Sequence, residues 1–208
     1  MIRERAPDVY DLTLDELNGG RYRVFLFDSD APTLVDAGFE HTVDVAVDRL
    51  DELGVDPERL VVTHGDGDHV GGLTGIADRY DLETWVPRQT ELASHAPDHR
   101  YGDGDDVGPF TAVHTPGHTA DHHALVDEEA GVAVLGDAVF GSDSRGLPEG
   151  HFVLPPGFYS ENLNEADASL ERLLDYSFEV GLVYHGSSVT DGAGEKIERF
   201  VEFRGKPQ

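Results

Sequence analysis

The chain of 208 residues lacks cysteine altogether and has only two lysines, Lys196 and Lys206. Without cysteine it can form no disulfide, no thiolate zinc site and no iron–sulfur cluster, and it has no Cys nucleophile. It also lacks any run of 18 consecutive apolar residues, and residues 1–12 have no apolar segment typical of a secretion signal. We therefore expect a cytoplasmic protein without a membrane segment.

Positive charge is scarce. The sequence has 15 Lys and Arg against 42 Asp and Glu, a formal net charge of -27. A protein that binds nucleic acid needs cations to displace counterions, and an anionic membrane surface attracts basic segments. The charge therefore argues against nucleic acid and an anionic membrane as partners. The partner we expect is a small-molecule substrate.

The acidic residues are scattered along the whole chain rather than collected in a tail. Such a composition is typical of a salt-accumulating cytoplasm, where at about 1 M salt the Debye length is only about 3 Å. At low ionic strength the same surface should repel itself and lose stability. We expect a halophilic protein; the alternative is an ordinary acidic protein with a charged surface.

Apolar periodicity predicts strands that alternate with helices. The predicted strands cover residues 22–27, 32–36, 60–63, 83–86, 110–114, 123–126, 132–135 and 181–184. The predicted helices cover residues 41–53, 73–79, 89–95, 165–174 and 194–203. This order indicates an α/β layered protein, and no composition shift marks a linker, so we expect one domain over residues 1–208. Residues 141–157 form a long irregular stretch, either a functional lid or a place where the assignment fails.

The richest motif is Thr-His-Gly-Asp-Gly-Asp-His-Val-Gly-Gly at residues 63–72. Four polar side chains, those of His64, Asp66, Asp68 and His69, follow a predicted strand within six residues. The intervening glycines let the backbone fold tightly enough for several side chains to converge. Imidazole and carboxylate together bind borderline and hard divalent metals.

Three further residues, His118, Asp137 and His185, each lie just past the end of a predicted strand. In layered α/β folds, binding sites gather at such strand ends. Four strand ends that each lead to a metal-type ligand favour a metal centre over chance.

These residues resemble the ligand set of the metallo-β-lactamase superfamily, whose motif is His-x-His-x-Asp-His followed by a His, an Asp and a His. The resemblance covers almost the whole chain and implies a four-layer αββα sandwich of two mixed β-sheets flanked by helices. It also implies two divalent metal ions, zinc by family. By the resemblance, His64 and His118 match the first metal site, Asp68, His69 and His185 match the second, and Asp137 bridges them.

Position 66 departs from this pattern, because it holds Asp where the family most often has His. Asp66 is either a turn residue, with the first site lost, or a ligand with a negative charge. If Asp66 is a ligand, the net charge of two divalent ions, three Asp and one bridging hydroxide is zero, whereas with His at position 66 it would be +1. The lower net charge favours harder ions such as Fe or Mn. The flavodiiron branch of the superfamily is similar in having a carboxylate here.

The expected activity is that of a metal-dependent hydrolase, with a metal-bound hydroxide attacking a carbonyl. Asp68 would be catalytic, orienting the hydroxide or accepting its proton. The segment Thr115–Thr119 resembles the glyoxalase II-like branch, which implies a thioester substrate, or else a lactone or ester. The alternatives are a di-iron or mono-iron redox protein of the same fold, acting on oxygen, nitric oxide or a persulfide, and a catalytically degenerate metal-binding member.

The adjacent His122 and His123 enter a predicted strand and should point to opposite faces. One of them either orients a ligand or, as the interpretation we favour, is a satisfied strand histidine. His114 is expected to be structural. His151 lies in the irregular stretch, where it either lines a substrate pocket with Phe140, Phe158 and Tyr159 or packs under a loop.

Overall fold

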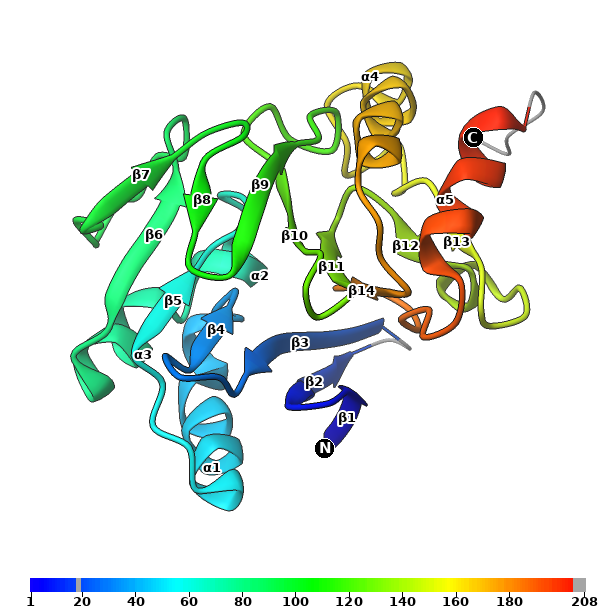
Figure 1. Ribbon diagram of the computed structural model, residues 1–208. Coiled ribbons are helices and arrows are strands. Elements are labelled where there is room, and N and C mark those ends of the chain that lie inside the picture. Colours follow the sequence, from blue (N-terminus) through cyan, green and yellow to red (C-terminus); the bar gives the residue numbers. More distant parts are fainter. Residues whose placement is uncertain (18–19, 204–208) are drawn as a thin grey trace. The chain divides into compact units, whose positions relative to one another are not determined.

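A computed structural model describes residues 1–17 and 20–203 (Figure 1). The chain divides into two compact units, unit 1 from Met1 to Tyr101 and unit 2 from Gly102 to Gln208. Each unit is built around one mixed β-sheet with helices. The prediction of one domain over residues 1–208 stays a prediction.

Unit 1 contains a seven-stranded sheet whose strands follow one another in chain order. Its elements are β1 (Ile2–Ala6), β2 (Val9–Leu17), β3 (Gly20–Phe27), β4 (Thr33–Val35), α1 (Val43–Leu53), β5 (Arg59–Val61), α2 (Gly67–Val70), α3 (Leu73–Tyr80), β6 (Glu83–Pro87) and β7 (His99–Tyr101). Strands β1 to β4 pair antiparallel, and β4 to β7 pair parallel. The parallel half therefore directs several strand ends toward one edge.

Helices α1 and α3 pack on one face of this sheet (Figure 1). Ala46 and Leu50 of α1, which lie about one helical turn apart, and Ile76 of α3 are fully buried in the core. Gly54 ends α1 in the left-handed conformation, with φ 70°, as expected for a helix-ending glycine.

Unit 2 contains a five-stranded sheet in the order β14-β11-β10-β9-β8. Its elements are β8 (Asp106–Val107), β9 (Phe110–His114), β10 (His123–Asp127), β11 (Val132–Gly136), β12 (Phe140–Gly141), β13 (Phe152–Val153), α4 (Leu163–Ser169), β14 (Val180–Val183) and α5 (Ala193–Glu202). Strands β11 and β14 pair parallel, and the other pairs of this sheet are antiparallel.

The core of unit 2 lies between this sheet and its helices, with Ala166 of α4 and Ile197 of α5 packed against strand residues such as Leu135. The helix predicted over 165–174 is instead α4 followed by a 3-10 segment, Leu170–Asp175. The irregular stretch 141–157 holds a short 3-10 segment, Ser142–Arg145, and the ends of the β12–β13 pair.

The prediction of a helix over residues 89–95 is wrong, because these residues form a turn and irregular backbone. The amide of Thr90 donates to the carbonyl of Pro87, and the Arg100 guanidinium donates to the carbonyls of Pro87, Arg88 and Thr90. The Arg100 side chain thus occupies backbone carbonyls that would accept hydrogen bonds from backbone amides in a helix.

Strands β1, β2, β7, β8, β12 and β13 were not predicted. Strand β2 was missed although Leu12 and Leu14 alternate with polar residues, whereas β8, β12 and β13 have only two residues each and are too short to show a period.

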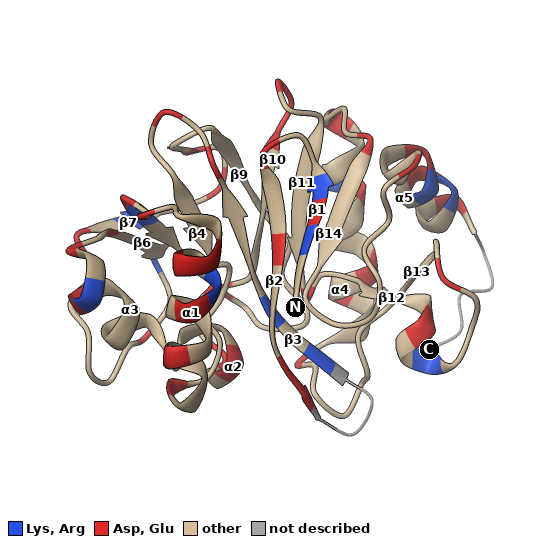
Figure 2. Ribbon diagram, turned by 90° about the horizontal axis from the view of Figure 1, so that it is seen from below, with Lys and Arg blue, Asp and Glu red and all other residues tan. Residues whose placement is uncertain are grey.

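Among the described residues, no helix is both long enough and apolar enough to cross a membrane. Acidic residues are spread over helices, strands and turns of both units, and basic residues are few (Figure 2).

Candidate metal centre

The first set of predicted ligands lies in unit 1, immediately after β5. His64 follows this strand and is fully buried, and His69 lies on α2 and is also fully buried. Asp68, on the same short helix, is half-buried. Gly72 lets this segment approach the chain after β4, because a Cβ there would lie 2.3 Å from the carbonyl oxygen of Ala37.

A buried carboxylate, Asp36, supports both histidines of unit 1. Its Oδ1 accepts hydrogen bonds from the amide of Thr63 at 2.8 Å and from the Thr63 hydroxyl at 3.0 Å. Its Oδ2 accepts from His69 Nδ1 at 2.9 Å. Asp36 has φ 64°, a left-handed conformation that is uncommon for a residue other than glycine. The fold thus maintains a strained backbone to place this carboxylate.

This network sets the tautomers of the two rings. A carboxylate only accepts, so Nδ1 of His69 carries the proton and Nε2 carries the lone pair. The Thr63 hydroxyl donates to Asp36 and therefore accepts from His64 Nδ1, which lies 3.1 Å away. Both imidazoles consequently present Nε2 as a potential metal ligand.

Sequence reasoning missed Asp36, although it follows the apolar segment Thr33–Val35 directly. An Asp that ends an apolar strand in the same way as the predicted ligands was the available signal. Its burial and its hydrogen bonds to Thr63 and His69, which separate it from an exposed left-handed residue such as Asp81, are visible only in the structure.

Asp66 lies beside His64, with Oδ2 3.6 Å from His64 Nε2. Its side chain is 44% exposed, unlike the fully buried ring of His64. A half-exposed carboxylate this close to the Nε2 atom of buried His64 suits a metal ligand with a short side chain.

The second set of predicted ligands lies in unit 2, after β9, β11 and β14. His118 is 3% exposed, and its Nδ1 lies 3.3 Å from the Ser160 hydroxyl. That hydroxyl donates to the carbonyl of Pro156, so it accepts from His118. Nε2 of His118 then carries the lone pair, as in the histidines of unit 1.

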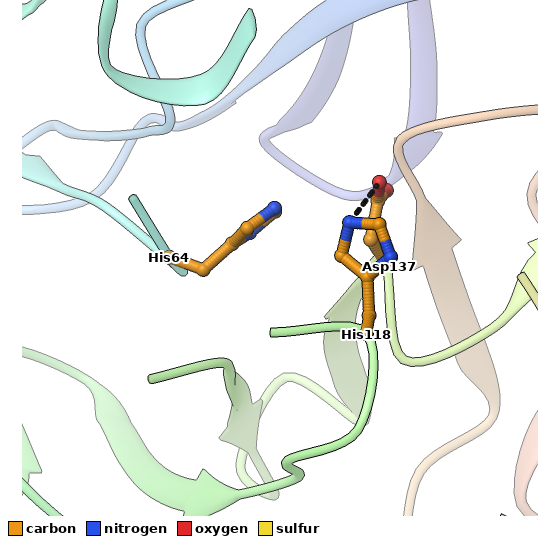
Figure 3. Close-up of side chains that lie close together, drawn as sticks. All are labelled: His64, His118 and Asp137. Carbon is orange, nitrogen blue, oxygen red and sulfur yellow. Dashed lines mark ion pairs between the residues drawn. The ribbon is translucent and has the colours of Figure 1, made fainter. Parts of the chain in front are cut away.

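Two imidazoles of unit 2 meet on one carboxylate oxygen. Nε2 of His118 and Nε2 of His185 each lie 3.4 Å from Oδ2 of the buried Asp137 (Figure 3 shows His118 and Asp137). Ligands about 2.1 Å from a tetrahedral ion lie about 3.4 Å from one another. Each Nε2–Oδ2 pair therefore has the spacing of two ligands of one divalent ion, as expected of a carboxylate shared between two ions.

His185 is held by residues 140–143, which are distant in the sequence. The amide of Gly141 donates to the His185 carbonyl at 2.9 Å, and the Phe140 ring lies 4.6 Å from the imidazole. Asp143 accepts from the amide and the hydroxyl of Ser187 at 2.6 and 2.8 Å. The 3-10 segment of the irregular stretch thus stabilises the turn that carries His185.

The remaining histidines of unit 2 differ in their surroundings. His122 is fully buried, and its Nε2 accepts a hydrogen bond from the amide of Asp137 at 3.0 Å. His123 pairs across the sheet with His114, with ring centroids 4.8 Å apart. Burial, followed by the nearby His114, lowers the pKa of His123. His151 is exposed.

Comparisons with known proteins agree with this fold. The family model of the metallo-β-lactamase superfamily matches residues 21–178. The chain therefore belongs to the metallo-β-lactamase superfamily, and the predicted fold class is confirmed.

Among solved structures, a metallo-β-lactamase from Pontibacter korlensis has a TM-score of 0.75 at 17% identity, covering 98% of this chain and 99% of that one. A metallo-β-lactamase family protein from Thermus thermophilus has a TM-score of 0.69 at 20% identity, covering 94% and 78%. These likenesses concern the fold alone.

The curated relatives are more similar in sequence. A β-lactamase-like protein 2 homologue of Caenorhabditis elegans is 31% identical over 72% of this chain and 48% of its own length. A hydroxyacylglutathione hydrolase of Xylella fastidiosa is 32% identical over 42% and 34%, and an atrochrysone carboxyl ACP thioesterase of Passalora fulva is 29% identical over 68% and 40%. The chain thus spans about half or less of the length of these relatives.

Proposed function

We propose that the protein is a metal-dependent hydrolase that cleaves thioesters or related esters. The observation that carries this proposal is the position of Asp137, whose Oδ2 lies 3.4 Å from Nε2 of His118 and 3.4 Å from Nε2 of His185, as a carboxylate shared by two ions would. Superfamily membership and the hydrolases among its relatives support it.

The proposed ligands are His64, Asp66 and His118 for one ion and Asp68, His69 and His185 for the other, with Asp137 shared. Zinc is the ion we expect by family. When bound, two divalent ions would lower the pKa of a water molecule and polarise the substrate carbonyl. Asp68, a half-buried carboxylate, is proposed to orient that water and accept its proton.

The residues that surround the proposed ligands hold three of the histidines in one tautomer. Asp36, Thr63 and Ser160 fix which ring nitrogen carries the proton in His69, His64 and His118. This support holds each ligand in position before substrate arrives.

The proposed substrate is a small molecule with an apolar part. Phe158 and Tyr159 are 89% and 68% exposed and pack edge to face, with ring centroids 5.0 Å apart. They belong to the turn whose Ser160 contacts His118, and Glu161 of the same segment donates its amide to the His118 carbonyl. An exposed aromatic pair on the segment that is hydrogen-bonded to the proposed metal ligand His118 suits contact with the acyl or thiol group of a substrate.

A second candidate function is iron-dependent redox chemistry on oxygen, nitric oxide or a persulfide. The position of Asp66 next to His64 favours it, because a third carboxylate suits harder ions. Substituting Asp66→His should shift metal preference toward zinc; unchanged metal selectivity and affinity would show that Asp66 is not a ligand.

Elemental analysis of protein prepared in high salt, followed by a panel of thioesters, esters and lactones, tests the proposal. We expect about two metal ions per chain, thioester turnover, and loss of both in Asp137→Ala. Asp127→Ala is the control, since Asp127 is a buried carboxylate outside the proposed set that accepts from the Ala130 amide. One metal or none would overturn the two-metal mechanism, iron with oxygen consumption would favour the second candidate, and two metals without turnover would indicate a degenerate member.

A further inference from the structure

We propose that His122 is a positioning residue that fixes the shared carboxylate Asp137 through the backbone, and that it acts only as one tautomer. The inference rests on the proposed function, because Asp137 needs to be positioned only if it is a metal ligand. The hydrogen bonds that carry it are internal to unit 2.

The Asp137 amide lies at an irregular point of the sheet. Pairing of β11 with β14 shifts register between Val134 and Gly136, and Gly136 has φ 52°. The chain therefore leaves the strand just before Asp137, where a regular ladder no longer supplies a partner for its amide. A buried amide needs a partner, and His122 Nε2 provides it at 3.0 Å.

The donor defines the state of the ring. An amide can only donate, so Nε2 of His122 holds the lone pair and the proton of the neutral ring lies on Nδ1. Nδ1 lies 2.8 Å from the hydroxyl oxygen of Thr115, which also accepts from the Ala124 amide at 3.2 Å. Both ring nitrogens are thus engaged in opposite roles.

The same histidine closes the segment that carries His118. The Thr115 amide donates to the His122 carbonyl at 2.9 Å, so residues 115 and 122 join the two ends of this segment. His122 therefore connects the His118 segment with the backbone of Asp137. Its substitution should disturb the spacing between two proposed ligands without removing either.

Neighbouring His123 provides a matched control. It is also buried, but its Nδ1 contacts the carbonyl of Asp121, and its ring packs against His114. Gln at position 122 is the conservative variant, because its side-chain oxygen can reach toward the place of Nε2 and accept from the Asp137 amide. Leu keeps similar bulk and removes the acceptor.

The first measurement is the zinc affinity of the full chain in high salt, by chelator competition. We expect His122→Leu to weaken zinc binding by about 10-fold to 100-fold, His122→Gln to recover most of this loss, and His123→Leu to leave affinity within about 2-fold. Unchanged affinity in His122→Leu, or an equal loss in His123→Leu, would overturn the proposal.

The second measurement needs neither metal nor activity. In the metal-free wild-type protein labelled with nitrogen-15 histidine, NMR should show His122 with its proton on Nδ1, and the Asp137 amide should be protected from hydrogen exchange. A proton on Nε2 would overturn the proposal even if His122→Leu fails to fold. If the wild type binds no zinc, the proposed function fails, whereas the tautomer still decides the role of His122.

Discussion

The two units support their histidines in different ways. In unit 1 a single buried carboxylate, Asp36, accepts directly from His69 and, through Thr63, from His64. In unit 2 the groups bonded to His118 and to the amide of Asp137 are neutral, namely the Ser160 hydroxyl and the His122 ring, and a carboxylate, Asp143, supports only the turn that carries His185. Unit 1 therefore concentrates its support in one charged residue, whereas unit 2 distributes it over several weaker hydrogen bonds.

This difference predicts unequal sensitivity to substitution. Removing a buried acceptor of several donors leaves each donor unsatisfied, and the losses accumulate. Removing one neutral partner among several leaves the rest of the network in place. The predictions below run from the largest expected effect to the smallest; the first and the last test this contrast, and the others test features of unit 2 alone.

Substituting Asp36→Ala should lower the free energy of unfolding by about 3–5 kcal/mol, because three buried hydrogen bonds lose their acceptor. Denaturant titration in high salt measures this change. Asp81→Ala is the control, since Asp81 also has a left-handed backbone, φ 55°, but is exposed. Its cost should be about 1 kcal/mol. Equal losses at the two positions would attribute the effect to backbone strain rather than to the carboxylate.

Substituting Gly117→Ala should be the most damaging single change beside a ligand in unit 2, at about 2–4 kcal/mol. Gly117 has φ 130°, and a Cβ there would lie 2.0 Å from the amide nitrogen of Ala166. Thermal unfolding checks the effect against Gly104→Ala, a position with φ 77° and nothing within 4 Å of the added carbon. If both variants lose the same stability, the close approach of Gly117 to α4 is not the reason why position 117 requires glycine.

Much of this architecture follows from the sequence, and the exceptions have physical causes. Helix α1 and strands β9, β10 and β11 were predicted because their apolar spacing matches their burial. The candidate ligands could be picked out from the sequence because the motif glycines and the strand ends are local signals. Asp36 and His122 could not be assigned roles, since their partners lie 27 and 15 residues away, at Thr63 and Asp137.

Acid should weaken unit 2 through a histidine outside the proposed ligand set. Burial, followed by His114, lowers the pKa of His123, so the folded protein binds this proton less readily than the unfolded chain does. The stabilisation is fully present above the unfolded pKa of about 6.5 and is lost as the pH falls toward the folded pKa. The slope contributed by one proton is at most about 1.4 kcal/mol per pH unit.

The variant His123→Phe keeps an aromatic ring against His114 and removes this titration. Its free energy of unfolding, measured from pH 7.5 to 5.5, should fall less steeply than that of the wild type. Parallel curves for the two proteins would show that His123 does not carry this acid sensitivity.

The smallest effect is expected from Ser160→Ala, which removes one neutral partner of His118. The free energy of unfolding should fall by about 1 kcal/mol. Ser169→Ala is a matched control, because its hydroxyl likewise donates to a backbone carbonyl, that of Ala166, and within the described part of the chain no hydrogen bond links it to a proposed ligand. The two variants should lose similar stability, yet only Ser160→Ala should weaken zinc binding, by up to about 10-fold, because His118 would no longer be held as the tautomer with its lone pair on Nε2. A loss of unfolding free energy in Ser160→Ala as large as that in Asp36→Ala would contradict the contrast between the units, since one neutral hydroxyl would then matter as much as a carboxylate that supports two rings.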